Sequence, residues 1–319
     1  MNALQFKNGQ VRLADVAKPS RADEAIVRVL LSGICNTDLE IARGYAGFEG
    51  TLGHEFVGVV EEAPGRSDLL GKRVVGEINA GCGKCSLCRA HDPRHCPTRT
   101  VLGIHGRDGA HAEFLSLPME NLLAVPDEVS DEEAVFVEPL AAAYGIYEQV
   151  PLGHHTRVAI IGDGKLGLLV ALSYGATAGT ALLVGKHDKK LAIARNAGIE
   201  TCLLKDLDRS ANNSFDVVVE ASGSASGFAT ALDLVRQRGK IVLKSTFSGE
   251  PTWAASRVVV DEITIVGSRC GRFEPALKLL GRGKLDLSPF ISDEFRLTDG
   301  VRAMERAAEP GVLKVLLRP

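Results

Sequence analysis

Residues 157–171 read RVAIIGDGKLGLLVA, and this stretch decides the fold of the second half of the chain. An apolar run precedes three glycines at the spacing G-x-G-x-x-G, and a helical pattern follows them. In such a strand, turn and helix, the first glycine makes a tight turn and the second admits a pyrophosphate to the helix N-terminus. A glycine-rich turn in another wound sheet is the alternative, but it leaves the three glycines together unexplained. We predict a dinucleotide-binding loop formed by Gly162, Gly164, Lys165, Leu166 and Gly167.

The segments around this loop alternate short apolar runs with helical patterns. The runs are RVAII (157–161), TALLV (180–184), TCLL (201–204), DVVVE (216–220), KIVLK (240–244) and ITIVG (263–267). Such an alternation is typical of a doubly wound α/β fold, in which helices cover both faces of a parallel sheet. We place this domain at residues 148–283.

The N-terminal half has a different texture. Residues 1–147 are rich in glycine and turn signals, and short β-like runs such as EAIVRVLLSGI (24–34) predict a β-rich domain. Residues 284–319 are too few to fold alone. We expect this tail to complete the first domain, so that the cofactor domain is an insertion between its two pieces.

Composition excludes several classes of protein. A chain of 319 residues is too long for one ordinary core, and its formal charge of -3 lacks the positive field of nucleic-acid binders. The longest apolar stretch is broken by glycines and charges before it reaches about 18 residues, so we expect no membrane span. Of the seven cysteines, four lie between positions 82 and 96, which favours a reducing, cytoplasmic setting over disulfide pairs.

Those four cysteines, Cys82, Cys85, Cys88 and Cys96, form the pattern C-x2-C-x2-C-x7-C. This spacing lets one loop wrap tetrahedrally around a zinc ion, and four thiolates would leave no open position, so the site would be structural. An iron-sulfur cluster is the sharper rival; Pro97 fits the bacterial ferredoxin pattern, but the spacing before the fourth cysteine does not. Four free surface thiols are the remaining alternative, and they would be an oxidation hazard.

Further residues of ligand type are scattered along the first half. Cys35 and Thr37 lie in GICNTDLEI, His54 and Glu55 are adjacent in LGHEFVGVV, and Glu138 interrupts the apolar stretch VFVEPLAAAYGI. A carboxylate in such a stretch is costly to bury unpaired, and a metal ion would remove that cost. Singly each residue is weak evidence, since a lone cysteine or histidine is usually an ordinary core residue.

These motifs, in this order, resemble those of the zinc-containing medium-chain dehydrogenases over nearly the whole chain. The pattern is most similar to the sorbitol and threonine dehydrogenase branch, where a glutamate of an EPL motif replaces a cysteine ligand. The resemblance implies a GroES-like catalytic domain joined to a Rossmann domain. It also implies a catalytic zinc held by Cys35, His54 and Glu138, with a water or the substrate oxygen in the fourth position and Glu55 exchanging with that water.

The implied reaction is hydride transfer between an alcohol and a nicotinamide cofactor, giving an aldehyde or ketone. An open zinc site polarises a carbonyl or lowers the pKa of an alcohol. By the same resemblance Thr37 would pass the alcohol proton outward. Many relatives end this relay at a histidine five residues after the cysteine, whereas this chain has Glu40 there.

The end of the second strand bears on the choice of cofactor. NAD-specific relatives carry an acidic residue there, but this chain has Gly185 followed by Lys186 and His187. The strand end therefore lacks a carboxylate that would repel a 2′-phosphate, and Lys186 and His187 offer cationic donors to it. Both features favour NADP. The alternative is that both are solvated and Asp188 serves the ribose of NAD. The resemblance further suggests that Lys314 contacts the pyrophosphate.

Two other functions stay open at this point. A quinone or enoyl reductase of the same superfamily would lack both zinc sites, and a dinucleotide-sensing protein would keep the fold without catalysis. The substrate could be a polyol, a sugar, an amino alcohol or a simple alcohol. Relatives are commonly homodimers or homotetramers, so we expect a small-molecule partner and self-association, with neither nucleic acid nor membrane bound.

Overall fold

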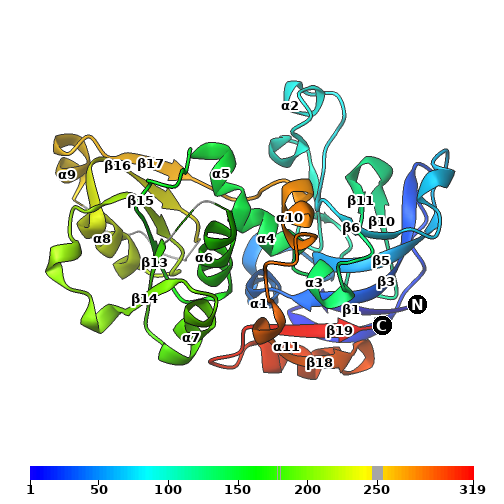
Figure 1. Ribbon diagram of the computed structural model, residues 1–319. Coiled ribbons are helices and arrows are strands. Elements are labelled where there is room, and N and C mark those ends of the chain that lie inside the picture. Colours follow the sequence, from blue (N-terminus) through cyan, green and yellow to red (C-terminus); the bar gives the residue numbers. More distant parts are fainter. Residues whose placement is uncertain (178, 180, 246–253) are drawn as a thin grey trace. The chain divides into compact units, whose positions relative to one another are not determined.

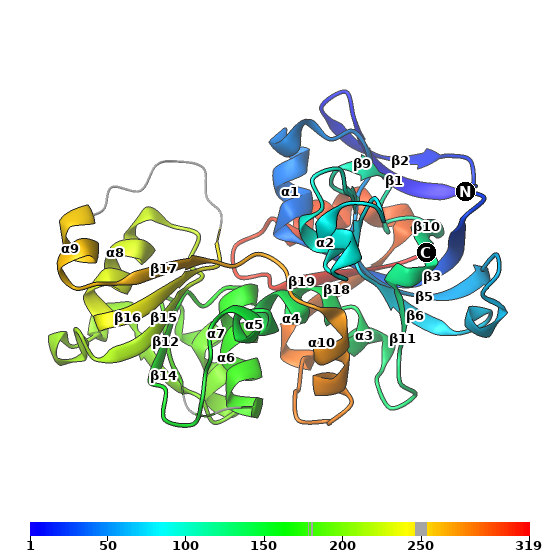
Figure 2. The ribbon, with the colours of Figure 1, turned by 90° about the horizontal axis from the view of Figure 1, so that it is seen from above.

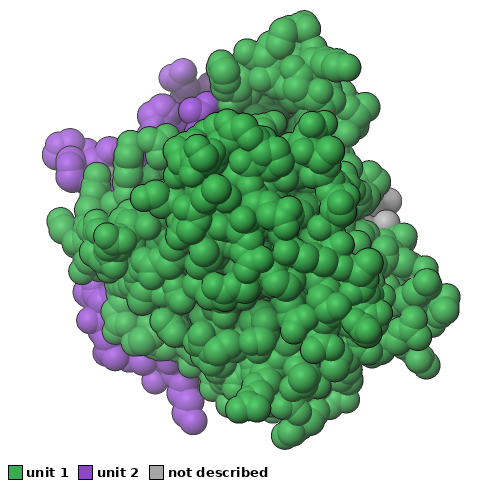
Figure 3. All heavy atoms as spheres, turned by 90° about the vertical axis from the view of Figure 1, so that its right-hand side faces the viewer, with its two compact units in different colours: residues 1–138, 273–319 green, residues 139–272 purple. Residues whose placement is uncertain are grey.

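The computed structural model describes residues 1–177, 179, 181–245 and 254–319. The chain divides into two compact units, one of residues 1–138 with 273–319 and the other of residues 139–272 (Figure 3). The boundaries expected from the sequence, 147/148 and 283/284, lie nine and eleven residues further along the chain than those of the structure. A helix explains the first difference, because α4 (Val137–Tyr144) crosses the boundary and offers no turn signal there.

The first unit is mostly β-structure, as the sequence predicts. Its strands are β1 (Asn2–Lys7), β2 (Gln10–Asp15), β3 (Glu24–Ile34), β4 (Gly50–Thr51), β5 (Glu55–Glu62), β6 (Arg73–Gly76), β7 (Asn79–Ala80), β8 (Thr100–Leu102), β9 (Gly106–Arg107), β10 (Phe114–Pro118), β11 (Leu122–Ala124), β18 (Ile291–Arg296) and β19 (Lys314–Arg318). Its helices are α1 (Asn36–Ala42), α2 (Ser86–Arg89), α3 (Asp131–Ala134), α10 (Phe273–Leu280) and α11 (Gly300–Ala307).

One sheet ties the two pieces of this unit together. Its strand order is β11-β6-β5-β3-β19-β18, with β10 also paired to β3. The C-terminal strand β19 runs antiparallel to β3, and Leu316 lies opposite Gly33 in the register. Leu4, Ile34 and Met304 belong to one buried cluster that joins the N-terminal strands to α11. The tail thus adds two strands, β19 and β18, to one side of a sheet that the first 138 residues begin.

The second unit is a parallel sheet of six strands in the order β14-β13-β12-β15-β16-β17 (Figures 1 and 2). Counted along the chain this is 3-2-1-4-5-6, the order of a dinucleotide-binding Rossmann fold. The strands are β12 (Val158–Ile161), β13 (Ala181–Gly185), β14 (Glu200–Leu203), β15 (Phe215–Glu220), β16 (Val235–Leu243) and β17 (Thr264–Gly267). The helices are α5 (Ile146–Gln149), α6 (Lys165–Thr177), α7 (Asp188–Asn196), α8 (Ala225–Leu234) and α9 (Ala255–Val260).

Helices cover both faces of this sheet. Figure 1 shows α6 on one face and α8 on the other. Val218, Phe228 and Ile241 pack in one of the layers between strand and helix, and burying each such side chain stabilises the fold by roughly 1.5–3 kcal/mol. In the described part of the chain, no helix is long and apolar enough to cross a membrane.

Candidate active site and metal centres

Three residues from the predicted catalytic site converge in the first unit. The ligand atoms of Cys35, His54 and Glu55 all lie within 4.8 Å of one another. Cys35 follows the last residue of β3 and forms the N-cap of α1, while His54 immediately precedes β5. Because β3 and β5 pair with Gly33 opposite Glu55, residues about twenty positions apart meet at one end of the sheet.

A buried carboxylate braces this cluster. Asp38 accepts hydrogen bonds from the amides of Cys35 (2.8 Å) and Gly53 (3.1 Å), and its Oδ1 lies 3.5 Å from His54 Nδ1. With Nδ1 facing Asp38, the nitrogen left for a metal is Nε2. On the other side, His111 Nε2 lies 3.5 Å from Asp38 Oδ2, and the Nδ1 atom of His111 is 2.9 Å from Ser32 Oγ.

A lysine from the C-terminal strand completes the site. The Nζ atom of Lys314 donates to Glu55 Oε2 and to the carbonyl oxygen of Ile34, and both charged side chains are essentially buried. Gly33 makes room for the pair, since a Cβ there would lie 2.6 Å from Glu55 Oε2 and 2.8 Å from Val135. Any larger residue would push the pair apart.

The electrostatics of the cluster favour a positive charge at its centre. Burial by itself would lower the pKa of His54, but Asp38 and Cys35 outweigh it and raise that pKa well above its usual value. Burial would raise the pKa of Asp38, yet His54 and His111 hold it well below its usual range. Within the described residues, Glu55 Oε1 is buried without a hydrogen-bond partner. A thiol, an imidazole and a carboxylate in such a pocket fit a zinc ion.

The remaining predicted catalytic residues lie on α1 and α4. Thr37 Oγ1 is 3.8 Å from the Cys35 sulfur. Glu40 is exposed on α1, where it accepts a hydrogen bond from Arg43 (2.7 Å). Glu138 is half-buried near the start of α4, and the group of residues within mutual ligand distance does not include it. The assignment of Glu138 as a ligand therefore stays a prediction.

The four clustered cysteines form a second candidate metal centre. Their sulfur atoms lie within 4.8 Å of one another around α2, on a loop that projects from the rest of the first unit (Figure 1). All four are free thiols. Gly81 is required beside them, because a Cβ would lie 2.7 Å from the Cys88 sulfur.

The thiols of this lobe do not ionise equally. The backbone amides of Lys84 and Cys85 lower the pKa of Cys82 to about 6. Burial and the neighbouring cysteines instead raise the pKa of Cys88 to about 11. A divalent cation would allow all four thiolates to coexist, and four thiolates are the usual donor set of structural zinc.

The glycine loop has the geometry that a dinucleotide needs. Gly162 has φ +114°, and a Cβ there would lie 2.6 Å from the Ala221 carbonyl oxygen. A Cβ on Gly167 would overlap the Gly162 carbonyl oxygen. At Gly164, by contrast, a Cβ would meet no atom of the described residues within 4 Å. This glycine therefore leaves open space beside the N-terminus of α6, where a pyrophosphate binds in Rossmann folds. Lys165 and Leu166 begin α6 there.

The predicted ribose-binding residues follow β13 as expected. Gly185 is the last residue of that strand, and Lys186 and His187 are exposed in the turn before α7. Asp188 begins α7 and forms an ion pair with Arg195 (2.8 Å). Lys314, assigned to the pyrophosphate from the resemblance, is the buried partner of Glu55.

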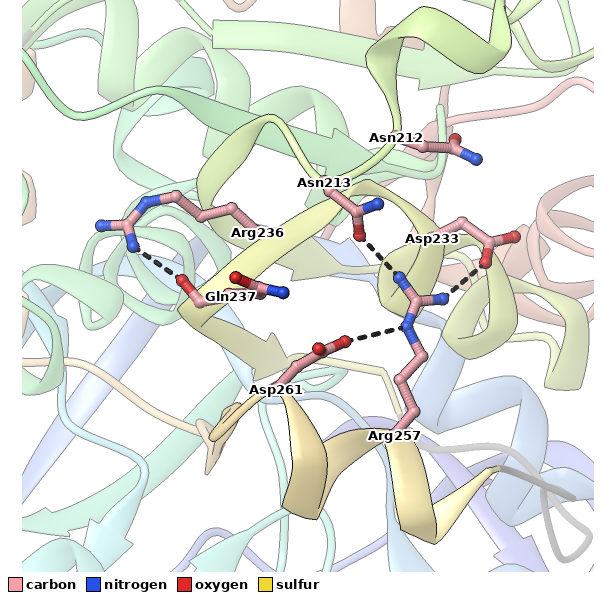
Figure 4. A pocket seen from close by; sticks show the side chains of 7 residues that line it. All are labelled: Asn212, Asn213, Asp233, Arg236, Gln237, Arg257 and Asp261. Carbon is pink, nitrogen blue, oxygen red and sulfur yellow. Dashed lines mark hydrogen bonds and ion pairs between the residues drawn. The ribbon is translucent and has the colours of Figure 1, made fainter.

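A hollow of about 730 Å³ lies at the opposite edge of the same sheet, near the amino ends of β15 and β16. Figure 4 shows how Arg257 reaches into it and bonds to Asp233, Asn213 and Asp261. Parallel strands place the glycine loop at their carboxyl ends, so this hollow is separate from the cofactor loop. Both of its arginines form ion pairs, Arg257 with Asp233 and Asp261 and Arg236 with Asp216, and we interpret the network as structural.

Sequence reasoning missed the residues that brace these sites. Asp38 has a signal in hindsight, since it stands three residues after Cys35 and closes a capping box with it. His111 and Lys314 have no such signal, because His111 lies 73 positions from Asp38 and Lys314 lies 259 positions from Glu55. Asp163, whose carboxylate accepts hydrogen bonds from the amides of Lys186 and His187, occupies an unspecified position of the glycine motif.

Comparison with known proteins agrees with this geometry. Residues 21–127 match the model of the alcohol dehydrogenase GroES-like domain, and residues 163–282 match that of zinc-binding dehydrogenases. A sorbitol dehydrogenase of Halalkalibacterium halodurans is 28% identical over 99% of this chain and 97% of its own length. An L-threonine 3-dehydrogenase of Coxiella burnetii is 31% identical over 95% and 94%.

A solved structure is similar throughout. The zinc-binding dehydrogenase of Sinorhizobium meliloti 1021, crystallised with NADP, is 26% identical, with a TM-score of 0.91 over 100% of this chain and 99% of the other. The protein therefore belongs to the zinc-type alcohol dehydrogenases of the medium-chain family. It is an oxidoreductase that moves a hydride between an alcohol and NAD(P), and the predicted fold and enzyme class are confirmed.

Proposed function

We propose that the protein is an NADP-preferring dehydrogenase with two zinc ions per chain, one catalytic and one structural. Cys35, His54 and Glu138 would hold the catalytic ion, and Glu55 would exchange with a water on that ion. The observation that carries the proposal is the convergence of Cys35, His54 and Glu55 within 4.8 Å beside the buried Asp38, to which the resemblance adds Glu138. The structural ion is held by the four cysteines of the lobe.

The residues of the site divide the work between them. A bound zinc ion supplies a Lewis acid that lowers the pKa of a substrate hydroxyl. Asp38 faces Nδ1 of His54 at 3.5 Å, so Nε2 would be the nitrogen that binds the ion. Thr37, 3.8 Å from the Cys35 sulfur, accepts the substrate proton through its hydroxyl and passes it toward Glu40 at the surface. Arg43 holds the Glu40 carboxylate at the surface end of this route, at 2.7 Å.

Metal content tests the two sites separately. We expect about two zinc ions per chain in the purified protein and about one in each of the variants Cys35→Ser and Cys85→Ser, measured by elemental analysis. Loss of activity should accompany the first variant only. A content of one zinc ion per wild-type chain would support the structural site only. A content of zero would instead support a zinc-independent reductase.

The preference for NADP is proposed from the turn after β13. Gly185 offers no carboxylate to the ribose, and the exposed Lys186 and His187 stand beside it. The NADP complex of the S. meliloti relative supports this choice.

Replacing Lys186 with Asp is expected to lower the ratio of kcat/KM for NADP to that for NAD by about 10- to 100-fold, because a charge-assisted hydrogen bond is lost and a repulsion is added. Steady-state kinetics with both cofactors measures this ratio. The matched control is Lys205→Ala, an exposed lysine in the same unit, for which the ratio should not change. An unchanged ratio in Lys186→Asp would favour the reading in which Asp188 serves the ribose of NAD.

For the substrate we propose a polyol, sugar or amino alcohol, since the similar proteins named above act on sorbitol and L-threonine. A panel of alcohols and aldehydes, with turnover followed by cofactor absorbance, tests this.

We further propose a homodimer or homotetramer in the cytoplasm, where the free thiols of the lobe stay reduced. Light scattering measures the oligomeric state.

A further inference from the structure

The side chain of Asp163 lies inside the turn that follows β13. Asp163 is the second residue of the glycine loop and is 7% exposed. Its Oδ2 atom accepts hydrogen bonds from the amides of Lys186 (2.8 Å) and His187 (2.6 Å), and His187 Nδ1 lies 3.1 Å from the same oxygen. One carboxylate thus links the loop expected to hold the pyrophosphate to the turn expected to hold the ribose.

The same carboxylate explains the glycine at the end of β13. A Cβ on Gly185 would lie 2.6 Å from both the Cβ and the Oδ2 of Asp163. The space into which a side chain at 185 would grow is already filled. An acidic residue at this strand end, which NAD enzymes use for the ribose hydroxyls, is therefore excluded by packing as well as absent from the sequence.

The hydrogen bonds also decide which donors the turn can offer. The amides of residues 186 and 187 point inward to Asp163 and cannot bind a ligand. The exposed side chains of Lys186 and His187 are the donors that remain, and within the described part of the chain Lys186 forms no ion pair. Because two amides and an imidazole surround the Asp163 carboxylate, this carboxylate repels a nearby phosphate less strongly.

We propose that Asp163 is a positioning residue that sets the cofactor preference. It holds the turn 185–187 so that Lys186 and His187 face the 2′-phosphate of NADP, and it blocks the strand-end position from which a carboxylate would select NAD. This inference rests on the proposed NADP preference. The selectivity for NADP over NAD then depends on Asp163, a residue of the glycine loop, as well as on the two cationic side chains.

The first test uses fragments of the cofactor, so that catalysis and zinc play no part. Calorimetry measures the dissociation constants of 2′,5′-ADP and 5′-AMP for the purified protein and for Asp163→Asn, which keeps the size of the side chain but directs an NH₂ group or a neutral oxygen at the two amides. We expect the preference for 2′,5′-ADP over 5′-AMP to fall by about 10-fold, since a charge-assisted hydrogen bond is removed. A merely structural role would weaken both fragments equally.

The matched control is Asp208→Asn. Asp208 also accepts a backbone amide, that of Ser210 (2.6 Å), and it lies in the same unit on an exposed turn. Its replacement should leave the preference unchanged. If the wild-type protein binds the two fragments equally, the proposed NADP preference is wrong. If the wild type prefers 2′,5′-ADP and Asp163→Asn keeps that preference, only the role of Asp163 is wrong.

A double variant tests the blocking of the strand end. Asp163→Gly combined with Gly185→Asp removes both the Cβ and the carboxylate at 163 and places a carboxylate on the strand, and we expect it to bind NADH at least about 10-fold tighter than Asp163→Gly alone. Equal binding by the two would overturn the steric part of the proposal. Should the double variant fail to fold, Gly185→Ala decides the steric part: its Cβ should destabilise the wild-type protein in urea denaturation but not the Asp163→Gly variant, and equal losses in both would overturn it.

Discussion

Cys35→Ser is expected to lower kcat/KM for alcohol oxidation by at least about 1,000-fold, which corresponds to about 4 kcal/mol of transition-state stabilisation. The thiol lies within 4.8 Å of the ligand atoms of His54 and Glu55, so the variant removes the sulfur donor from the only group of the described residues that combines these three types. A serine hydroxyl is a poor zinc ligand at neutral pH. The Lewis acid that the reaction needs would therefore be lost.

Binding of the cofactor should survive this change, because the glycine loop belongs to the other compact unit. Quenching of protein fluorescence by NADPH measures it. Cys202→Ser is the control: Cys202 is half-buried in β14 and donates to the Leu203 carbonyl oxygen (3.3 Å), and its replacement should leave kcat/KM within about twofold. Substantial turnover by zinc-free Cys35→Ser would contradict the proposed site.

The fold was predictable because its signals are local. The strand, turn and helix of residues 158–177 follow from an apolar run, three glycines and a helical pattern that are contiguous in the chain. The four cysteines of the lobe are equally local, and the structure brings their sulfur atoms together. The limits of the units were less predictable, since a continuous helix such as α4 leaves no mark in composition where one unit ends.

The candidate active site was only partly predictable because its contacts are long-range. Cys35 and His54 could be singled out as ligand types, but the pairing of β3 with β5 is what brings them together. Asp38 was not singled out from the sequence, although it closes the capping box of α1. From the sequence, Glu55 was predicted to exchange with a ligand of the metal. In the structure its side chain contacts Lys314, 259 positions later, because β19 pairs with β3.

That buried pair leads to the largest effect on stability. Lys314 and Glu55 are 2% and 0% exposed, and burial alone would lower the pKa of the lysine. Glu55 and Cys35 outweigh burial and raise that pKa, so the ammonium stays charged in the folded protein. Its loss would leave a carboxylate in an apolar setting formed in part by Phe136 and Val135, with Oε1 already unpartnered within the described residues.

Lys314→Met is therefore expected to lower the free energy of unfolding by about 3–5 kcal/mol, the usual result of removing one partner from a buried ion pair. Urea denaturation of the zinc-loaded protein measures the loss. Lys278→Met is the control, because Lys278 forms an exposed pair with Glu274 on α10 and should change stability by less than about 0.5 kcal/mol. In Glu55→Gln/Lys314→Met both charges are gone, and stability should return to within about 1 kcal/mol of wild type. A double variant as unstable as Lys314→Met would mean that the lysine stabilises the unit through its packing rather than by neutralising Glu55.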